Sequence, residues 1–183
     1  SSIPIEAIGF LVLDHPEIYL SIPAMNLLVE NNTALIICAT NHLPNGMLLN
    51  LNSHHIQQEI FKNQIDASVP LKKQLWQQTI IEKITNQGIL LEKIEKSKNQ
   101  FEYLASKVLS GDTTNMEAVA ASQYWKRFFE TGFKRERFGN YPNNFLNYGY
   151  AILRAATARA LSGSGLLNTL GIHHKSKYNA FAL

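Results

Sequence analysis

The first fifty residues consist of short apolar runs separated by turn residues. Runs of this length that are rich in β-branched and aromatic side chains are typical of strands. Pro23–Asn32 differs, because Ala24, Leu27 and Leu28 recur at helical spacing and Asn31-Asn32 is a stop signal. The predicted strands are Ile8–Leu13, Ile18–Ile22, Thr33–Ala39 and Met47–Leu51, the last of them after a Pro44-Asn45-Gly46 turn.

From Pro70 onward the apolar positions recur about every 3.6 residues, which predicts helices. Pro70 is a favourable first residue, Gly88 is a weak point, and Ser110-Gly111-Asp112 breaks the pattern that reaches Leu104. Two more helices are predicted at about Thr114–Phe129 and Phe145–Leu161, with a basic loop at Lys134–Asn143 between them and a helix end at Gly163 and Gly165.

These patterns predict an α+β protein with a small N-terminal β-rich domain at residues 1–52 and a larger all-helical domain at residues 70–183. Residues 53–69 are polar and are predicted to form a linker or a short helix. No apolar run is long enough to span a bilayer, and the single cysteine, Cys38, excludes an intramolecular disulfide. We therefore expect a cytoplasmic protein without a membrane partner.

The net charge of +3 is unevenly distributed along the chain. Residues 1–91 hold 4 Lys and Arg against 7 Asp and Glu, whereas residues 92–183 hold 13 against 7. From Lys126 to Lys177 there are 9 basic and 2 acidic residues, interleaved with aromatic side chains. Cations beside aromatic rings can contact phosphates and stack on bases, so this segment is a candidate nucleic-acid surface. A solvated helix face with ordinary core aromatics is the alternative.

Glu117 lies one turn into the helix that begins near Thr114. The segment Thr114-Asn115-Met116-Glu117 matches the S/T-x-x-E capping box, in which the glutamate bonds back to the cap amide. Spacing alone favours this capping role. A carboxylate at that place can also hold a hard divalent cation, so both roles stay open.

His173 and His174 follow Gly171 in a predicted loop. A histidine at such a place is most often a surface residue. Neutral imidazole and a carboxylate together can also hold a divalent metal, with manganese favoured over calcium by the nitrogen ligand. The second pair, His54-His55, matches no chelating spacing, and the sequence contains no CxxC, HExxH or phosphate-binding glycine loop.

Three segments of the second half are Ala120–Phe129, Asn143–Leu153 and Leu170–His174. They resemble segments of the CRISPR-associated integrase/endonuclease of spacer acquisition, and the resemblance extends along the whole chain. In the first half, Ser2–Ile5, Asp14, Leu43-Pro44 and Pro70–Trp76 are similar to the form found in type II CRISPR systems. The resemblance implies a prokaryotic protein in which a small β domain is joined to a helical catalytic domain.

The resemblance also implies an activity and a site. The activity is metal-dependent DNA nicking and transesterification, which inserts a captured DNA fragment into a CRISPR array. Glu117 and His174 correspond to a glutamate and a histidine that are catalytic metal ligands for Mg²⁺ or Mn²⁺; His173 is assigned no metal bond. We expect DNA backbone contacts, some of them replaced by structural ion pairs, from Lys126, Arg127, Arg135, Arg137, Arg154, Arg159 and Lys175.

The implied partners are DNA (the captured fragment and the CRISPR repeat), a second copy of the chain, a small CRISPR adaptation partner protein and other type II CRISPR proteins. Two departures from the family pattern indicate a fragment that lacks both ends. The first strands of the family's β domain would precede Ser1, and a third, acidic metal ligand would follow Leu183. We therefore expect this fragment alone to be inactive, and a non-catalytic DNA-binding or assembly module is the alternative function.

Overall fold

The computed structural model describes residues 2–52, 54–95, 100–129, 132–136 and 139–174. The chain forms two compact units. The described residues of the first unit fall within Ser1–Asp66 and Arg137–Gly171, and those of the second within Ala67–Glu136 and Ile172–Lys175.

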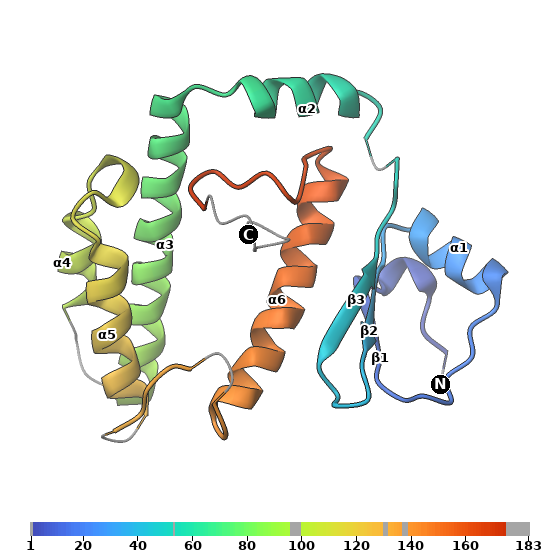
Figure 1. The fold of residues 1–183 in the computed structure, drawn as a ribbon, viewed down its shortest axis with the longest axis horizontal. Helices are drawn as coiled ribbons and strands as arrows, with labels where there is room; N and C mark the ends of the chain where they lie inside the picture. Colours follow the sequence, from blue (N-terminus) through green and yellow to red (C-terminus); the bar gives the residue numbers. More distant parts are fainter. Residues whose placement is uncertain (1, 53, 96–99, 130–131, 137–138, 175–183) are drawn as a thin grey trace. The chain divides into compact units, whose positions relative to one another are not determined.

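The first unit contains a three-stranded sheet of β1 (Phe10–Leu13), β2 (Ala34–Cys38) and β3 (Pro44–Leu48), in the order β1-β2-β3 (Figure 1). A short 3₁₀ turn, η1 (Ile5–Ala7), precedes β1. Strand β1 pairs in parallel with β2, with Phe10 opposite Ala34, and β3 pairs with β2 in the antiparallel direction. A parallel pair needs a crossover connection, which here contains α1 (Ile22–Glu30).

Two helices accompany the sheet. Helix α6 (Asn143–Gly163) packs against β2 and β3, as Figure 1 shows. Helix α2 (Gln57–Asp66) is tied to the segment after α6 by the Gln64 amide, which donates to the carbonyls of Leu167 (3.1 Å) and Leu170 (3.2 Å). The Gln64 side-chain oxygen also accepts from the Leu167 amide at 2.8 Å.

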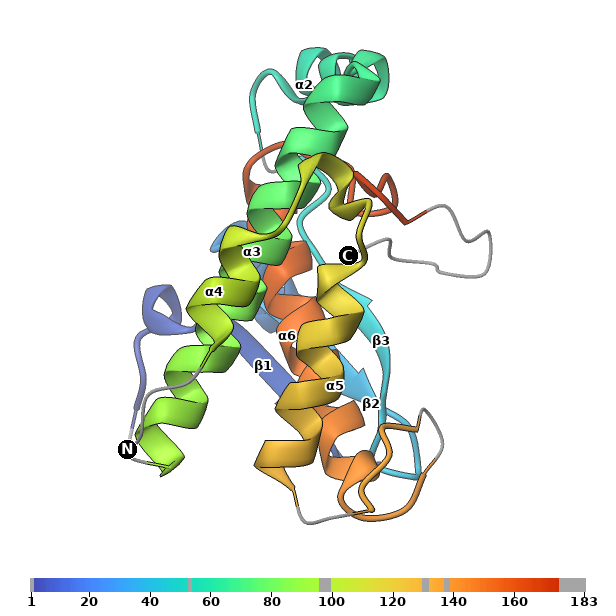
Figure 2. The ribbon, with the colours of Figure 1, turned by 90° about the vertical axis from the view of Figure 1, so that its left-hand side faces the viewer.

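The second unit is helical and consists of α3 (Val69–Glu95), α4 (Phe101–Ser106), the 3₁₀ turn η2 (Ser110–Asp112) and α5 (Met116–Phe128) (Figure 2). Helix α3 contacts all three of the other elements. Its buried residues recur every three or four positions, so one face supplies most of the core. They are Trp76, Ile80, Ile84, Gly88 and Leu91. Phe101 and Leu104 of α4 and Ala120 of α5 are among the other residues of this core.

The α+β prediction is confirmed: a small sheet near the N-terminus is followed by a mostly helical region. None of the described helices is long and apolar enough to cross a membrane. Helix α3 continues through Gly88 without a break, because packing of the neighbouring buried residues on the same face outweighs the low helix propensity of glycine.

Two predicted strands are wrong in place or type. Residues 18–21 form no strand, and Ile22 is already helical, because the Ser21 hydroxyl accepts from the Ala24 amide (3.3 Å) and caps α1. Pro44-Asn45-Gly46 was predicted as a turn but lies within β3. The chain reverses earlier, where the Ala39 and His42 amides donate to the carbonyls of Leu43 and Ala39 and His42 adopts a left-handed conformation (φ 61°).

The two compact units do not follow the predicted segments 1–52, 53–69 and 70–183. Helix α6 packs with the sheet, and α2 lies in the first unit rather than in a linker. The reason is that an open sheet must cover its apolar face, and α6 supplies that cover from far along the chain. The domain division of the whole protein stays a prediction.

Candidate functional site

Glu117 lies in the first turn of α5 and is partly buried. Its Oε1 accepts from the Lys83 Nζ of α3 at 2.5 Å, so a cation already lies on this carboxylate. Both residues belong to the second unit. The Glu117 side chain is therefore directed toward a positive partner on α3.

The N-terminus of α5 is capped by Asp112 of η2. Asp112 Oδ1 accepts from the Met116 amide (2.8 Å) and its Oδ2 from the Glu117 amide (3.0 Å). The residue at the cap position, Asn115, is left-handed (φ 54°) and makes no side-chain cap bond. The predicted capping box from Thr114 to Glu117 is therefore wrong, because a carboxylate from the preceding turn takes both amides.

Asp112 should consequently stabilise α5 far more than Thr114 does. We expect Asp112→Ala to lower the free energy of unfolding by about 2 kcal/mol, because two amides lose their acceptor and a negative charge leaves the helix N-terminus. Asp112→Asn keeps one acceptor oxygen and should cost less. Urea denaturation of these variants and of Thr114→Ala is the measurement. A larger loss for Thr114→Ala than for Asp112→Ala would contradict this assignment.

His173 and His174 are placed by Trp76 of α3. The His173 ring stacks on the buried Trp76 indole, with the centroids 4.4 Å apart and the planes within 4° of parallel. The His174 ring meets the same indole edge-on at 5.2 Å, and the two histidine rings lie 5.8 Å apart at 76°. Ile172 packs against the core of the unit, while both histidine residues are exposed. The segment is thus anchored with its imidazoles open to solvent.

The structure places the predicted ligands Glu117 and His174 in one unit, both beside α3. Within the described residues, no three His, Cys, Asp or Glu side chains lie close enough together to hold a metal ion. The donor types nevertheless fit a divalent metal, since a carboxylate oxygen and an imidazole nitrogen are ligands for Mn²⁺, and Lys83 shows that a cation is accepted at the carboxylate. The pair His54-His55 lies in the other unit, with its rings stacked at 4.8 Å.

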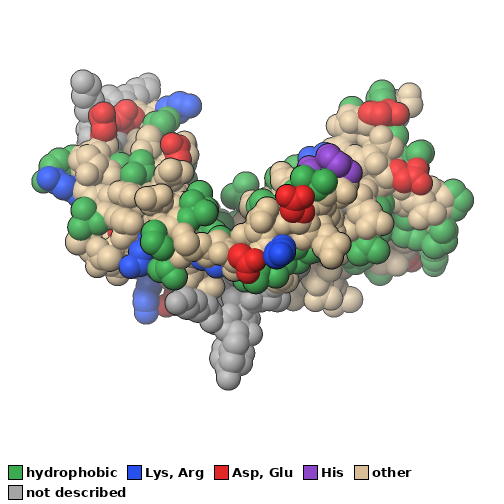
Figure 3. Space-filling view, turned by 90° about the horizontal axis from the view of Figure 1, so that it is seen from above, with side chains coloured by type: hydrophobic (Ala, Val, Ile, Leu, Met, Phe, Trp, Pro, Cys, Tyr) green, Lys and Arg blue, Asp and Glu red, His purple; other side chains and the backbone are tan. Residues whose placement is uncertain are grey.

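The predicted DNA-contacting residues have different surroundings. Two of them have structural partners: Arg127 pairs with the Glu95 carboxylate, and Arg159 donates from Nε to the Asn32 carbonyl. Arg135 donates to the Glu136 carbonyl at 2.9 Å. Lys126 and Arg154 are exposed, whereas Arg137 and Lys175 lie outside the described residues. On the face drawn in Figure 3, the described basic side chains are scattered among acidic and apolar ones.

The aromatic residues of the basic segment mostly contact one another. Trp125 stacks with Phe129 at 5.9 Å, and Phe129 lies 4.3 Å from Phe133. Tyr124 and Phe128 join the same cluster. These rings therefore stabilise the end of α5 and the segment after it, which favours the packing alternative over base stacking for this cluster.

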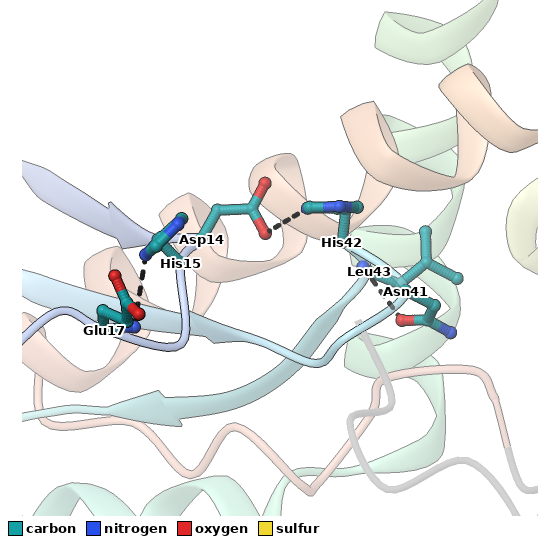
Figure 4. A network of polar contacts seen from close by, with 6 residues as sticks. All are labelled: Asp14, His15, Glu17, Asn41, His42 and Leu43. Carbon is teal, nitrogen blue, oxygen red and sulfur yellow. Dashed lines mark hydrogen bonds and ion pairs between the residues drawn. The ribbon is translucent and has the colours of Figure 1, made fainter.

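A second polar cluster lies where the parallel strands β1 and β2 end, and sequence reasoning did not identify it (Figure 4). Asp14 Oδ1 lies 3.1 Å from His42 Nδ1, beside a pocket of about 360 Å³ that Cys38 also lines. Burial raises the pKa of the Cys38 thiol, and the Asp14 carboxylate raises it further. The thiolate is therefore disfavoured, and Cys38 is not suited to nucleophilic chemistry. The signal available in the sequence was that Asp14 directly follows one predicted strand and that His42 lies shortly after another.

Comparisons with known proteins cover the whole chain. The family model described as "CRISPR associated protein Cas1" matches residues 1–183. The chain is 39% identical to the CRISPR-associated endonuclease Cas1 of Neisseria meningitidis over 184 aligned positions, which cover 100% of this chain and 60% of that protein. It is also 38% identical over 93 residues to a second such endonuclease, from Pyrobaculum aerophilum, covering 49% of this chain and 30% of that one.

Solved structures of low identity share the fold. A Cas1 protein from Thermotoga maritima gives a TM-score of 0.67 at 15% identity, covering 98% of this chain and 62% of that one. A casposase bound to an integration product gives 0.66 at 19% identity, covering 96% and 55%. The chain spans about 60% of the length of the Neisseria relative. The match of the family model over all 183 residues and the agreement in fold show that this chain belongs to the Cas1 family of CRISPR-associated proteins.

Proposed function

We propose that this chain is the core of a metal-dependent DNA endonuclease/integrase that inserts captured DNA fragments into a CRISPR array by transesterification. Besides membership of the family, one structural observation supports this proposal. Glu117 and His174, far apart in sequence, belong to one unit and are both anchored to α3, by Lys83 and by Trp76. Two similar proteins support the proposal by their names. The Neisseria relative is named an endonuclease, and a structure of similar fold is a casposase bound to an integration product.

In this proposal Glu117 and His174 hold a divalent ion, Mg²⁺ or Mn²⁺, with a third acidic ligand expected beyond Leu183. When bound, the ion supplies Lewis acidity and charge neutralisation for phosphate chemistry. The protein residues have separate tasks. Asp112 fixes the first turn of α5 and with it the Cα of Glu117, while Lys83 keeps the carboxylate extended toward α3.

The proposed partners are DNA, a second copy of the chain, a small adaptation protein and other type II CRISPR proteins. A partial Cas6-RT-Cas1–Cas2 complex, similar in fold with a TM-score of 0.59 at 21% identity, covering 99% of this chain and 60% of that one, supports assembly with a CRISPR partner. The cytoplasmic location stays a prediction.

A non-catalytic DNA-binding or assembly module is the second candidate. It is favoured by one observation, that no three His, Cys, Asp or Glu side chains of the described residues lie close enough together to hold a metal ion. Strand transfer by the whole protein in Mn²⁺, compared with the same reaction after Glu117→Gln, separates the two functions. An enzyme transfers strands and loses this activity with the substitution, whereas an assembly module binds DNA and transfers none.

The basic segment should bind duplex DNA mainly through phosphates. We expect Arg135→Ala together with Arg137→Ala to reduce the slope of log K against log salt by about 1.8, because each lost phosphate contact removes about 0.9. Fluorescence anisotropy at several salt concentrations measures the slope. Lys62→Ala with Lys93→Ala removes the same charge from outside the segment and should leave the slope unchanged. Equal slopes for wild type and the arginine double variant would show that residues 134–140 do not contact phosphates.

A further inference from the structure

Helix α3 contacts both halves of the proposed metal site from one face. Trp76 and Lys83 are seven positions apart, about two helical turns, so their side chains lie along the same side of the helix. Trp76 contacts the two histidines, and Lys83 contacts Glu117. Neither residue is itself a metal ligand in the proposed function.

We propose that Trp76 is a positioning residue, which fixes the direction of the His174 imidazole by holding His173 in a parallel ring stack. The inference rests on the proposed metal site and adds to it the group that orients one of its ligands. In this role His173 contributes by stacking its ring on Trp76, and its nitrogens do not bind the metal.

The Trp76 side chain is a rigid support for such a stack. Trp76 is only 7% exposed and belongs to the same buried cluster as Ile80, Ile84 and Ala120. The histidines, by contrast, are exposed and lie in a segment without regular secondary structure. An exposed imidazole on such a segment rotates freely unless something holds it, so the contact with a fixed indole is what restricts it.

The geometry of the three rings makes the restriction specific. His173 lies flat on the indole, within 4° of parallel, whereas His174 stands at 77° to the indole and 76° to His173. A ring that meets two others edge-on has few rotations open to it, because aromatic pairs favour stacked and edge-to-face arrangements. Groups that orient a metal ligand from outside the coordination shell typically change metal affinity by 10- to 100-fold.

The contact itself is tested without metal and without DNA. In the whole protein carrying ¹³C-labelled histidine, the His173 ring protons should be shifted upfield by the indole ring current. His173→Phe assigns the signal by removing it, and Trp76→Leu should return it to the shift of a free histidine. A His173 signal at the free-histidine shift in the wild type would overturn the inference.

The positioning role is tested with Mn²⁺ alone, by counting free ion in electron paramagnetic resonance titrations. We expect His173→Ala to weaken Mn²⁺ binding about tenfold, because it removes the stack while Trp76 stays in the core. His173→Phe keeps a flat ring on the indole and should restore the wild-type affinity. Both His173 variants leave the buried core unchanged, so their Mn²⁺ affinities test the positioning role even if Trp76→Leu does not fold.

The outcomes separate this inference from the proposed function. If Glu117→Gln weakens Mn²⁺ binding while His173→Ala does not, the metal site stands and the positioning role is wrong. Equal losses for His173→Ala and His173→Phe would make His173 a ligand and overturn the role as well. If Glu117→Gln leaves Mn²⁺ binding unchanged, the proposed metal site itself is wrong.

Discussion

Replacing Glu117 by glutamine should abolish nicking and strand transfer by the whole protein while its affinity for duplex DNA stays unchanged. Glutamine has nearly the same size and can still accept a hydrogen bond from Lys83, so the fold of the second unit should survive. The substitution removes the negative charge with which the Glu117 carboxylate would bind a divalent metal. A loss of roughly three orders of magnitude in rate is expected, since a bound Lewis acid supplies several kcal/mol of transition-state stabilisation and 1.36 kcal/mol corresponds to tenfold.

Three comparisons make this prediction specific. His174→Ala should have the same effect, and His173→Ala should be milder because its ring is assigned no metal bond. Thermal melts of each variant check that the loss is chemical and not structural. The purified chain of residues 1–183 is tested in the same assay, and Mn²⁺-dependent cleavage by it that Glu117→Gln abolishes would support the site. Cleavage that survives Glu117→Gln would refute the site.

The second large effect is expected at Gly165, where α6 ends. The Gly165 amide donates to the Ser162 carbonyl (2.9 Å) and the Leu166 amide to the Leu161 carbonyl (2.8 Å), which is a Schellman ending. Gly165 has φ +74°, and an added Cβ would lie 2.9 Å from both His54 Cβ and Ile60 Cδ1. Gly165→Ala should therefore lower the free energy of unfolding by about 3 kcal/mol, through left-handed strain and overpacking together.

Two other glycines provide matched controls. Gly132 has φ +104° with nothing within 4 Å of an added Cβ, so Gly132→Ala should show the strain without the clash. Gly149 lies inside α6 and also has open space, so Gly149→Ala should stabilise the protein by up to about 1 kcal/mol. Urea denaturation followed by circular dichroism measures all three. A Gly165→Ala variant no less stable than Gly132→Ala would contradict the packing around α2 and α6.

Helices were predicted more accurately than strands, and the reason lies in what each pattern requires. Ile80, Ile84 and Leu91 repeat at helical spacing because that spacing itself forms the buried face of α3. Ile18–Ile22 is rich in β-branched residues, yet Ile18 and Tyr19 are exposed, and composition alone cannot supply the partner strand that such a run needs. The reversal at Ala39–Leu43 depends on the left-handed His42, which no turn rule for Pro-Asn-Gly anticipates.

For the candidate site, residue patterns alone left Glu117 as a capping residue and His174 as a surface histidine. The resemblance to a family indicated both as ligands. Neither the residue patterns nor the resemblance predicted the contacts that place these two residues. Lys83 is 34 residues from Glu117, and Trp76 lies on a helix well before the histidines. Asp112 was identified only as a helix breaker, although an acidic residue shortly before a helix is also a signal for its cap.

The composition of the two units has a consequence for how the protein forms during synthesis. Helices α3, α4 and α5 contact one another within a continuous stretch of chain, so they can assemble as soon as that stretch has left the ribosome. The sheet is made earlier but must wait for α6, which begins only at Asn143. The apolar face of β2 is thus without its cover while the Ala67–Glu136 part of the second unit is translated, which is the interval in which chaperones or premature association would act. Because Ile172–His174 emerges later still, Trp76 receives its histidine partner among the last contacts that the described chain makes.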